Sequence, residues 1–202
     1  TEKVKIRRSL QRSFCNRKIL CAASTHKNEE EIISNIHLKL KKKFKNLLTI
    51  IIPRHVERSI EILETIHEKN LNYICHSEKK KIKKDTDIYL VDTYGESKNF
   101  YSISKVVYLG GSFIPKGGQN PLEPLRSGCY ITHGKYTFNF KEIYRMLDKK
   151  KLSFKAKNIL HLEKIIQNLL TRKSNNIKEV NKFKKIGNNI LKKNFEKIRV
   201  LI

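Results

Sequence analysis

The sequence predicts a doubly wound α/β domain, in which one parallel sheet carries helices on both faces. Short apolar runs alternate with longer segments whose apolar residues recur at helical spacing, a rhythm typical of parallel crossover connections. The apolar runs are continuous rather than alternating, which indicates strands buried on both sides. Hydrophobic residues make up 39% of the 202 residues, enough for a packed core and too many for a disordered chain.

Six segments have the length and composition of buried strands. The two longest are Lys18–Ser24 and Asn46–Ile52, and the second is stopped by Pro53. The shorter ones are Asn72–Cys75, Ile88–Val91, Val106–Leu109 and Cys129–Thr132.

Helical patterns fill the spaces between these strands. Asn28 is a suitable N-cap for an amphipathic helix over residues 28–40. Glu29, Glu30 and Glu31 would occupy its first turn, where the helix dipole favours carboxylates. A second helix is predicted over 56–69, and a short helix ends near residue 128.

Beyond Asn139 the pattern is helical to the end of the chain, so we expect a helical tail without further strands. Two apolar stripes, over 159–169 and 180–195, would cover the sheet, with a linker at 171–176 between them. We therefore divide the chain into residues 1–17, a sheet-bearing domain at 18–150 and C-terminal helices at 151–202.

The chain carries 44 Lys+Arg and 19 Asp+Glu, a net charge of +25. Its richness in Lys, Asn and Ile is the bias of an AT-rich genome, so the charge alone assigns no function. A basic protein is nevertheless drawn to nucleic acid or to an anionic membrane surface. An RNA-binding surface would interleave exposed aromatic residues with the basic ones, and the lysine runs at 41–43, 79–84 and 149–151 lack that pattern apart from Phe44.

Several classes of protein are excluded or disfavoured. No uncharged run exceeds ten residues, so a transmembrane helix is not expected. The charged start, TEKVKIRR, predicts no signal peptide, and a first residue Thr1 rather than Met suggests a piece of a longer protein. The four cysteines (Cys15, Cys21, Cys75 and Cys129) are far apart, so we expect small buried thiols in a reducing cytoplasm rather than disulfides or a zinc site.

Polar residues gather directly after four of the predicted strands. The segments are 24–26 (Ser-Thr-His), 53–55 (Pro-Arg-His), 92–96 (Asp-Thr-Tyr-Gly-Glu) and the long loop 110–123. Because ligands bind at the carboxyl ends of parallel strands, these segments predict a cleft at that edge of the sheet.

Arg54 and the long loop are the strongest candidates in this cleft. A guanidinium fixed by Pro53 could fork onto a phosphate or carboxylate, although an ion pair with Glu57 or Glu61 is equally plausible. The loop GGSFIPKGGQNPLEP has neither the ending of a phosphate-binding P-loop nor the dinucleotide spacing. Its Asn120 and Glu123 would suit sugar hydroxyls. The residues alone thus indicate a nucleotide- or phosphosugar-binding domain, without a nucleophile–base pair or an acidic metal cluster.

The segments at this edge also form a specific set in chain order. They are AASTHKNEEE at 22–31, PRHVER at 53–58, DTYGE at 92–96, GGSFIPKGGQNPLEP at 110–124 and HGKYTFNFKEIYRML at 133–147. Over about residues 18–150 the chain resembles the C-terminal half of the 3-deoxy-D-manno-octulosonic acid (Kdo) transferases. It departs from the family pattern at Asn28, where glycine is usual, at Val56, where proline is usual, and at Gln119, where histidine is usual.

The resemblance implies two Rossmann-like lobes with the active site between them, the C-terminal lobe holding the donor CMP-Kdo. It implies an inverting, metal-independent transfer whose catalytic base lies on the N-terminal lobe, so no catalytic residue, metal ligand or cofactor is expected in this chain. Residues 1–17 would end the connection between the lobes. The residues that the resemblance assigns to the CMP moiety are Pro53, Arg54, Tyr94, Gly95, Glu96, Asn120, Pro121, Leu122 and Glu123.

The implied partners are CMP-Kdo, the lipid A precursor, the N-terminal lobe and an anionic membrane surface. The implied location is the cytoplasmic face of the inner membrane of a Gram-negative bacterium. Two alternatives stay open: a truncated or split-gene lobe that is inactive without a separate N-terminal half, and, less favoured, a basic nucleic-acid-binding α/β domain.

Overall fold

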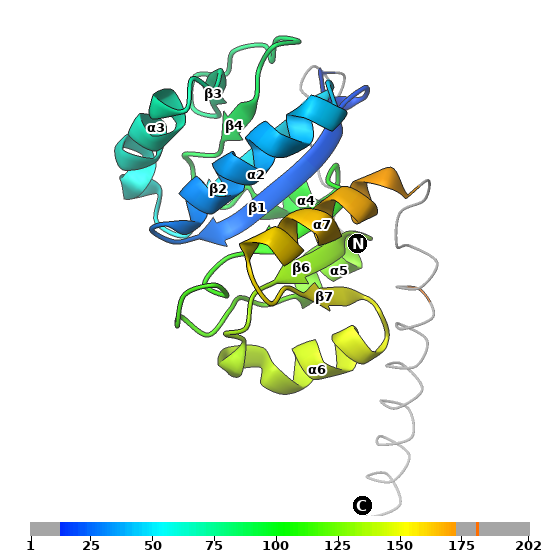
Figure 1. The fold of residues 1–202 in the computed structure, drawn as a ribbon. Coiled ribbons are helices and arrows are strands. Elements are labelled where there is room, and N and C mark those ends of the chain that lie inside the picture. The colour runs from blue at the N-terminus through cyan, green and yellow to red at the C-terminus, as the bar shows by residue number, and fades with distance from the viewer. Residues whose placement is uncertain (1–12, 173–180, 182–202) are drawn as a thin grey trace, which may run out of the picture.

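Seven parallel strands form one sheet in the order β3-β4-β2-β1-β5-β6-β7 (Figure 1). The structure is a computed structural model that describes residues 13–172 and residue 181. The strands are β1 (Lys18–Thr25), β2 (Leu47–Pro53), β3 (Tyr73–Cys75), β4 (Ile88–Leu90), β5 (Val106–Leu109), β6 (Tyr130–His133) and β7 (Ser153–Lys155).

Helices cover both faces of this sheet, which confirms the doubly wound fold. One apolar layer packs the sheet against α2 (Glu29–Lys43), α3 (Ser59–Glu68) and α7 (Ile159–Thr171), and Figure 1 shows α2 and α7 crossing in front of the strands. The opposite layer uses α4 (Ser97–Tyr101), α5 (Leu122–Arg126) and α6 (Lys141–Lys149). Successive residues of β1 alternate between the two layers, as a strand buried on both faces requires. Two short 3-10 helices, η1 (Val56–Arg58) and η2 (Phe138–Phe140), complete the elements.

The expectation of a purely helical chain beyond Asn139 is wrong. Strand β7 pairs in parallel with β6 and closes one edge of the sheet. Its three residues, Ser-Phe-Lys, are too few and too polar to signal a strand, although Leu152 directly before them is buried in the core. The sheet and its helical cover therefore continue past residue 150 to α7. The second apolar stripe, over 180–195, lies outside the described residues apart from residue 181.

The N-terminal residues that are described pack against the sheet domain. Phe14 is buried, with its ring against those of Tyr89 and Phe100. Arg17 donates hydrogen bonds to the carbonyl oxygens of Asn46 (2.9 Å), Leu47 (2.9 Å), Lys83 (3.1 Å), Lys84 (3.2 Å) and Thr86 (2.5 Å). Residues 14 to 17 of the expected interlobe connection are therefore part of the folded domain.

The cysteines agree with the sequence except at one position. Cys21, Cys75 and Cys129 are buried thiols, whereas Cys15 is exposed, against the expectation. Burial raises the pKa of Cys75 to about 11, so this thiol is protonated at neutral pH. Among the described helices, none is long and apolar enough to cross a membrane.

A buried polar cluster lies at the amino edge of the sheet. The His37 ring bonds to the hydroxyl of Thr49 (2.8 Å) and to the carboxylate of Asp87 (3.3 Å), which also accepts from Lys41. Burial, together with the charges of Lys41 and Arg17, lowers the pKa of His37 to about 3. His37 is therefore neutral in the folded protein at all physiological pH values.

This pKa predicts a loss of stability on acidification. Unfolded His37 takes up a proton near pH 6.5 and folded His37 only near pH 3, so between these values the unfolded state binds more protons. The free energy of unfolding should fall in this window by up to about 1.4 kcal/mol per pH unit. Urea unfolding between pH 7 and 5 measures the slope, and His37→Gln should remove this share of it. Equal slopes for both proteins would refute the assignment.

Candidate functional site

The strand order reverses between β1 and β5, and the segments that follow these strands meet at the carboxyl edge of the sheet. The amide of Arg54 donates to the carbonyl of Thr25 (2.9 Å), and the amide of Gly110 donates to the carbonyl of Ala23 (2.9 Å). The rings of His26 and His55 lie 6.1 Å apart. The predicted convergence of these segments at one edge is confirmed, and this is where α/β sheets bind ligands.

The long loop lies so close to the end of β1 that only glycine fits at its start. A Cβ on Gly110 would lie 2.2 Å from the carbonyl oxygen of Ser24, and one on Gly134 would lie 2.2 Å from that of Ser112. The φ of Gly111 is +66°, a left-handed value that suits glycine. These contacts hold the loop, the β1 end and the β6 end in one layer.

Glu29 occupies the centre of this layer. It stands in the first turn of α2 together with Glu30 and Glu31, as predicted. The helix begins at Glu29 as foreseen, but Asn28 makes no side-chain cap and has a φ of +75°. That left-handed turn directs the Glu29 side chain under the loop, where it is 0% exposed. Asn28 stands where the resemblance places a glycine, and asparagine is among the residues that tolerate this conformation.

Five donors bond to the Glu29 carboxylate. Oε2 accepts from the amides of Gly111 (2.7 Å) and His26 (3.1 Å). Oε1 accepts from the Tyr108 hydroxyl (2.6 Å) and from the amides of Ser112 and Phe113 (both 3.2 Å). Sequence reasoning missed this role because every partner but His26 is about eighty positions away.

Further bonds fix the rest of the loop. The amide of Gly118 donates to the carbonyl of Gly111 (2.9 Å), and Tyr144 donates to the carbonyl of Gln119 (2.8 Å). The Asn120 side chain accepts from the amide of Leu122 (3.0 Å), at the start of α5. Asn120 is thus engaged in shaping the turn.

Glu123 and Arg54 are two charged groups that the site leaves available. Glu123 is exposed in the first turn of α5. Arg54 is exposed beside the buried Pro53, and within the described part of the chain its guanidinium has no ion pair. The two carboxylates considered as its partners are occupied elsewhere: Glu61 pairs with Arg58 (3.2 Å) and Lys27 (3.4 Å), and Glu57 accepts from Tyr94 (2.8 Å).

The segment after β4 completes the edge. Tyr94 is 63% exposed, and its bond to Glu57 ties this segment to η1. Gly95 has a φ of +84°, and a Cβ added there would meet open space. Glu96 precedes α4, which starts at Ser97. Pro121 is buried and Leu122 half-buried at the start of α5. Of the nine predicted residues, Pro53 thus ends β2, and the other eight lie in the segments that follow β2, β4 and β5.

Unpartnered polar atoms gather at this edge. In the described chain, the buried side-chain atoms without a hydrogen bond are Thr25 Oγ1, His26 Nε2, Thr93 Oγ1 and, on α2, Ser34 Oγ. Burial is the main cause that lowers the pKa of His26. The Glu29 carboxylate opposes this shift, whereas His55, Lys116 and Arg54 act in the same direction as burial. The described residues hold no cluster of metal ligands.

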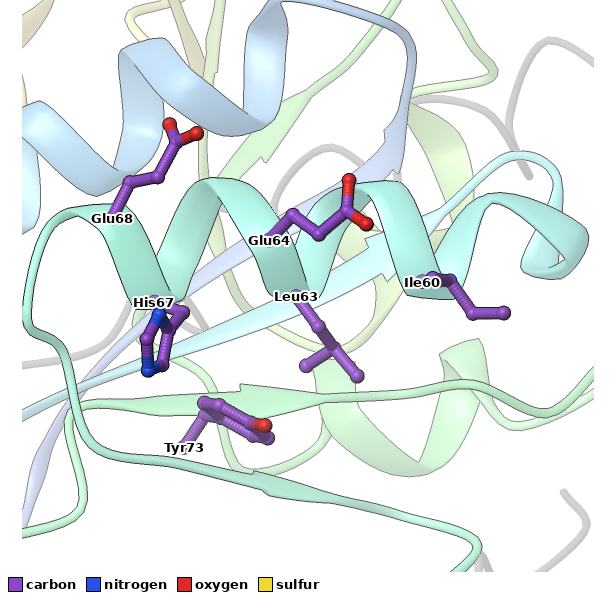
Figure 2. Close-up of a pocket in the computed structure, with 6 residues that line it drawn as sticks. All are labelled: Ile60, Leu63, Glu64, His67, Glu68 and Tyr73. Atoms are coloured by element: carbon purple, nitrogen blue, oxygen red, sulfur yellow. The ribbon is translucent and has the colours of Figure 1, made fainter.

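A groove of about 470 Å³ lies apart from this edge, between α3 and β3. Figure 2 shows Leu63 and His67 of α3 directed toward Tyr73, with Glu64 and Glu68 on the other side of the helix. None of the nine predicted residues lines it.

The fold was compared with those of known proteins. No family model matches the chain. The C-terminal CMP-Kdo binding domain of WaaA from Acinetobacter baumannii superposes with a TM-score of 0.80 at 29% identity, covering 87% of this chain and 92% of that domain. A UDP-N-acetylglucosamine 2-epimerase of Listeria monocytogenes shares the fold alone, with a TM-score of 0.54 at 17% identity.

Proteins similar in sequence include several Kdo transferases. The Kdo transferase of Haemophilus influenzae is 41% identical over 132 residues, 65% of this chain and 31% of the relative. That of Aquifex aeolicus is 31% identical over 154 residues, 76% of this chain and 42% of the relative. A bifunctional glycosyltransferase/methyltransferase of Fusobacterium nucleatum is 36% identical over 90% of this chain and 29% of the relative. The chain thus spans about a third of the length of these relatives.

The all-parallel sheet and the site at its switch point define a Rossmann-like domain, of the type that forms the C-terminal domain of two-domain glycosyltransferases. Within that class, the chain is homologous to the Kdo transferases and matches their C-terminal domain. The resemblance noted in the sequence is therefore confirmed.

The close approach of Gly110 to β1 predicts a steep cost for a side chain there. Gly110→Ala should lower the free energy of unfolding by about 3 kcal/mol, because the backbone of Ser24 blocks the added methyl. Gly95→Ala is the matched control, since it meets only open space and costs about 1 kcal/mol through its positive φ. Urea unfolding measures both, and equal losses would refute the steric argument.

Proposed function

We propose that this chain binds the nucleotide-sugar donor CMP-Kdo at the carboxyl edge of its sheet. The observation that carries the proposal is the position of the predicted residues: those after β2, β4 and β5 line one edge, in a domain superposable on one described as CMP-Kdo binding. The unpaired Arg54 and the free carboxylate of Glu123 supply the two chemistries that the donor needs, a cation for its phosphodiester and an acceptor for its ribose hydroxyls.

Each predicted residue has a place in this proposal. The guanidinium of Arg54 would fork onto the phosphodiester, with its backbone held by Pro53 and by the bond to Thr25. Tyr94, Gly95 and Glu96 would receive the CMP moiety along the β4 segment. Asn120, Pro121 and Leu122 would present Glu123 through the turn that they build. We propose that binding requires no divalent metal.

In the whole enzyme, we propose inverting transfer of Kdo to the lipid A precursor at the cytoplasmic face of the inner membrane. The catalytic base and the acceptor site would come from the part of the relatives that this chain does not match. The 202-residue chain should therefore bind the donor without turning it over, as expected of a lobe that needs its N-terminal half.

The experiment that tests the proposal is calorimetry of the chain with CMP in buffer containing EDTA. CMP should bind, and Arg54→Lys should weaken binding at least about tenfold, because an ammonium cannot reproduce the planar fork. The matched control, Lys81→Gln with Lys84→Gln, removes two exposed charges from a connecting segment and should leave CMP affinity nearly unchanged. An equal loss in both proteins would show that bulk charge governs binding. Glucose binding as tight as CMP binding would overturn the proposal.

Glu123 has its own test. If its carboxylate accepts the ribose hydroxyls, Glu123→Gln should weaken CMP binding by about 1–3 kcal/mol, the scale of a hydrogen bond to a charged group. Replacing CMP by deoxy-CMP should therefore reduce the affinity of the variant less than it reduces the affinity of the wild type. A variant that binds both nucleotides as the wild type does would return Glu123 to a purely structural role.

A further inference from the structure

The amides of Gly111, Ser112 and Phe113 form a nest, that is, consecutive backbone N–H groups that point at one anion. Nests need a residue with positive φ next to ordinary backbone, which the φ of +66° at Gly111 supplies. Such nests lie at the ends of strands in many phosphate sites. Here the anion is the chain's own Glu29 carboxylate, at 2.7 to 3.2 Å from the three nitrogens.

The carboxylate is compensated by hydrogen bonds alone. Within the described residues, no lysine or arginine forms an ion pair with Glu29, and its side chain is fully buried. An unpaired buried charge is costly unless donors surround it, and the nest, the Tyr108 hydroxyl and the amide of His26 are those donors. Burial and the neighbouring Glu29 raise the pKa of Tyr108 well above its ordinary value, so its hydroxyl remains a donor.

The nest is linked to the residues proposed for donor binding. Gly111 belongs to the nest, and its carbonyl accepts from the amide of Gly118 (2.9 Å), two residues before Asn120. Asn120 in turn shapes the turn that carries Glu123. Two hydrogen bonds therefore connect Glu29 to the ribose-binding end of the loop: one from the Gly111 amide to Glu29, and one from the Gly118 amide to the Gly111 carbonyl.

We infer that Glu29 is a positioning residue for donor binding: it fills the anion nest at the switch point as an internal ligand and so fixes the loop that presents Asn120 and Glu123. The donor's phosphodiester consequently binds outside this nest. The inference rests on the proposed function and adds to it a residue that does not touch the donor.

The test compares Glu29→Gln and Glu29→Ala with Glu31→Gln in the 202-residue chain. Glu31 is a matched control because it lies in the same helix turn, is exposed, and pairs only with Lys69 (3.2 Å) in the described part of the chain. Glu29→Gln keeps the shape but turns an NH₂ group toward N–H donors. It should weaken CMP binding at least about tenfold and speed hydrogen exchange at amides 111–113 by at least as much, while Glu31→Gln changes neither.

Chemical rescue separates positioning from a general loss of stability. Glu29→Ala removes the equivalent of an acetate ion from the nest, so added acetate should restore CMP affinity and amide protection, whereas chloride at the same ionic strength should not. If Glu29→Ala fails to fold, Tyr108→Phe provides the test instead. It removes one donor to the Glu29 carboxylate and should speed hydrogen exchange at amides 111–113.

Three results would overturn the inference. They are unchanged CMP affinity in a folded Glu29→Gln, unchanged exchange at 111–113 in every variant, and rescue by chloride as effective as by acetate. A wild-type chain that binds no CMP would instead overturn the proposed function, while faster exchange in Glu29→Gln would still show that Glu29 holds the loop.

Discussion

The buried carboxylate of Glu29 is the constraint on which the carboxyl edge depends. A charge cannot be taken from water without donors around it, and here the donors come from β5, the loop after it and the turn after β1. None of these segments can satisfy the carboxylate alone, so the turn and the loop must acquire their shapes together. The close contact of Gly110 with Ser24 follows from the same requirement, because the nest must lie directly above the β1 end.

Much of this fold follows from local patterns. Continuous apolar runs such as 47–52 predict central strands because a parallel sheet buries both of their faces, and the structure has a strand at each of the six predicted places. The same pattern does not predict β7, because this strand lies at an edge of the sheet, where polar residues such as Ser153 and Lys155 are tolerated. Its position depends on the α6–β7 connection, which periodicity does not describe.

The candidate site, too, could be predicted from the sequence only in part. Its edge was predictable, since polar residues after strands have few reasons to gather there except a cleft. The role of Glu29 was not, because a glutamate at a helix start has a sufficient local explanation in the helix dipole. The contrary signal was at Asn28: the family resemblance places glycine there, and a glycine position indicates positive φ rather than a side-chain cap. With the turn at +75°, the first glutamate points under the loop.

The availability of Arg54 is explained by how its neighbours are paired, not by the excess of positive charge. In a chain of net charge +25, most cations lack acidic partners, so an unpaired arginine is unremarkable in itself. Around Arg54, however, acids are present and engaged: Glu61 with Arg58 and Lys27, Glu30 with Arg58 (2.9 Å), and Glu57 with Tyr94. The cations Arg58 and Lys27 compensate the charges of Glu30 and Glu61, whereas the Tyr94 hydroxyl binds Glu57 without cancelling its charge. Arg54 therefore differs from the lysines of the connecting segments by its place: it is exposed beside the switch point, and the described residues offer its guanidinium no ion pair. A cation in that place attracts an anion to the edge of the sheet, which a lysine-rich surface elsewhere does not do.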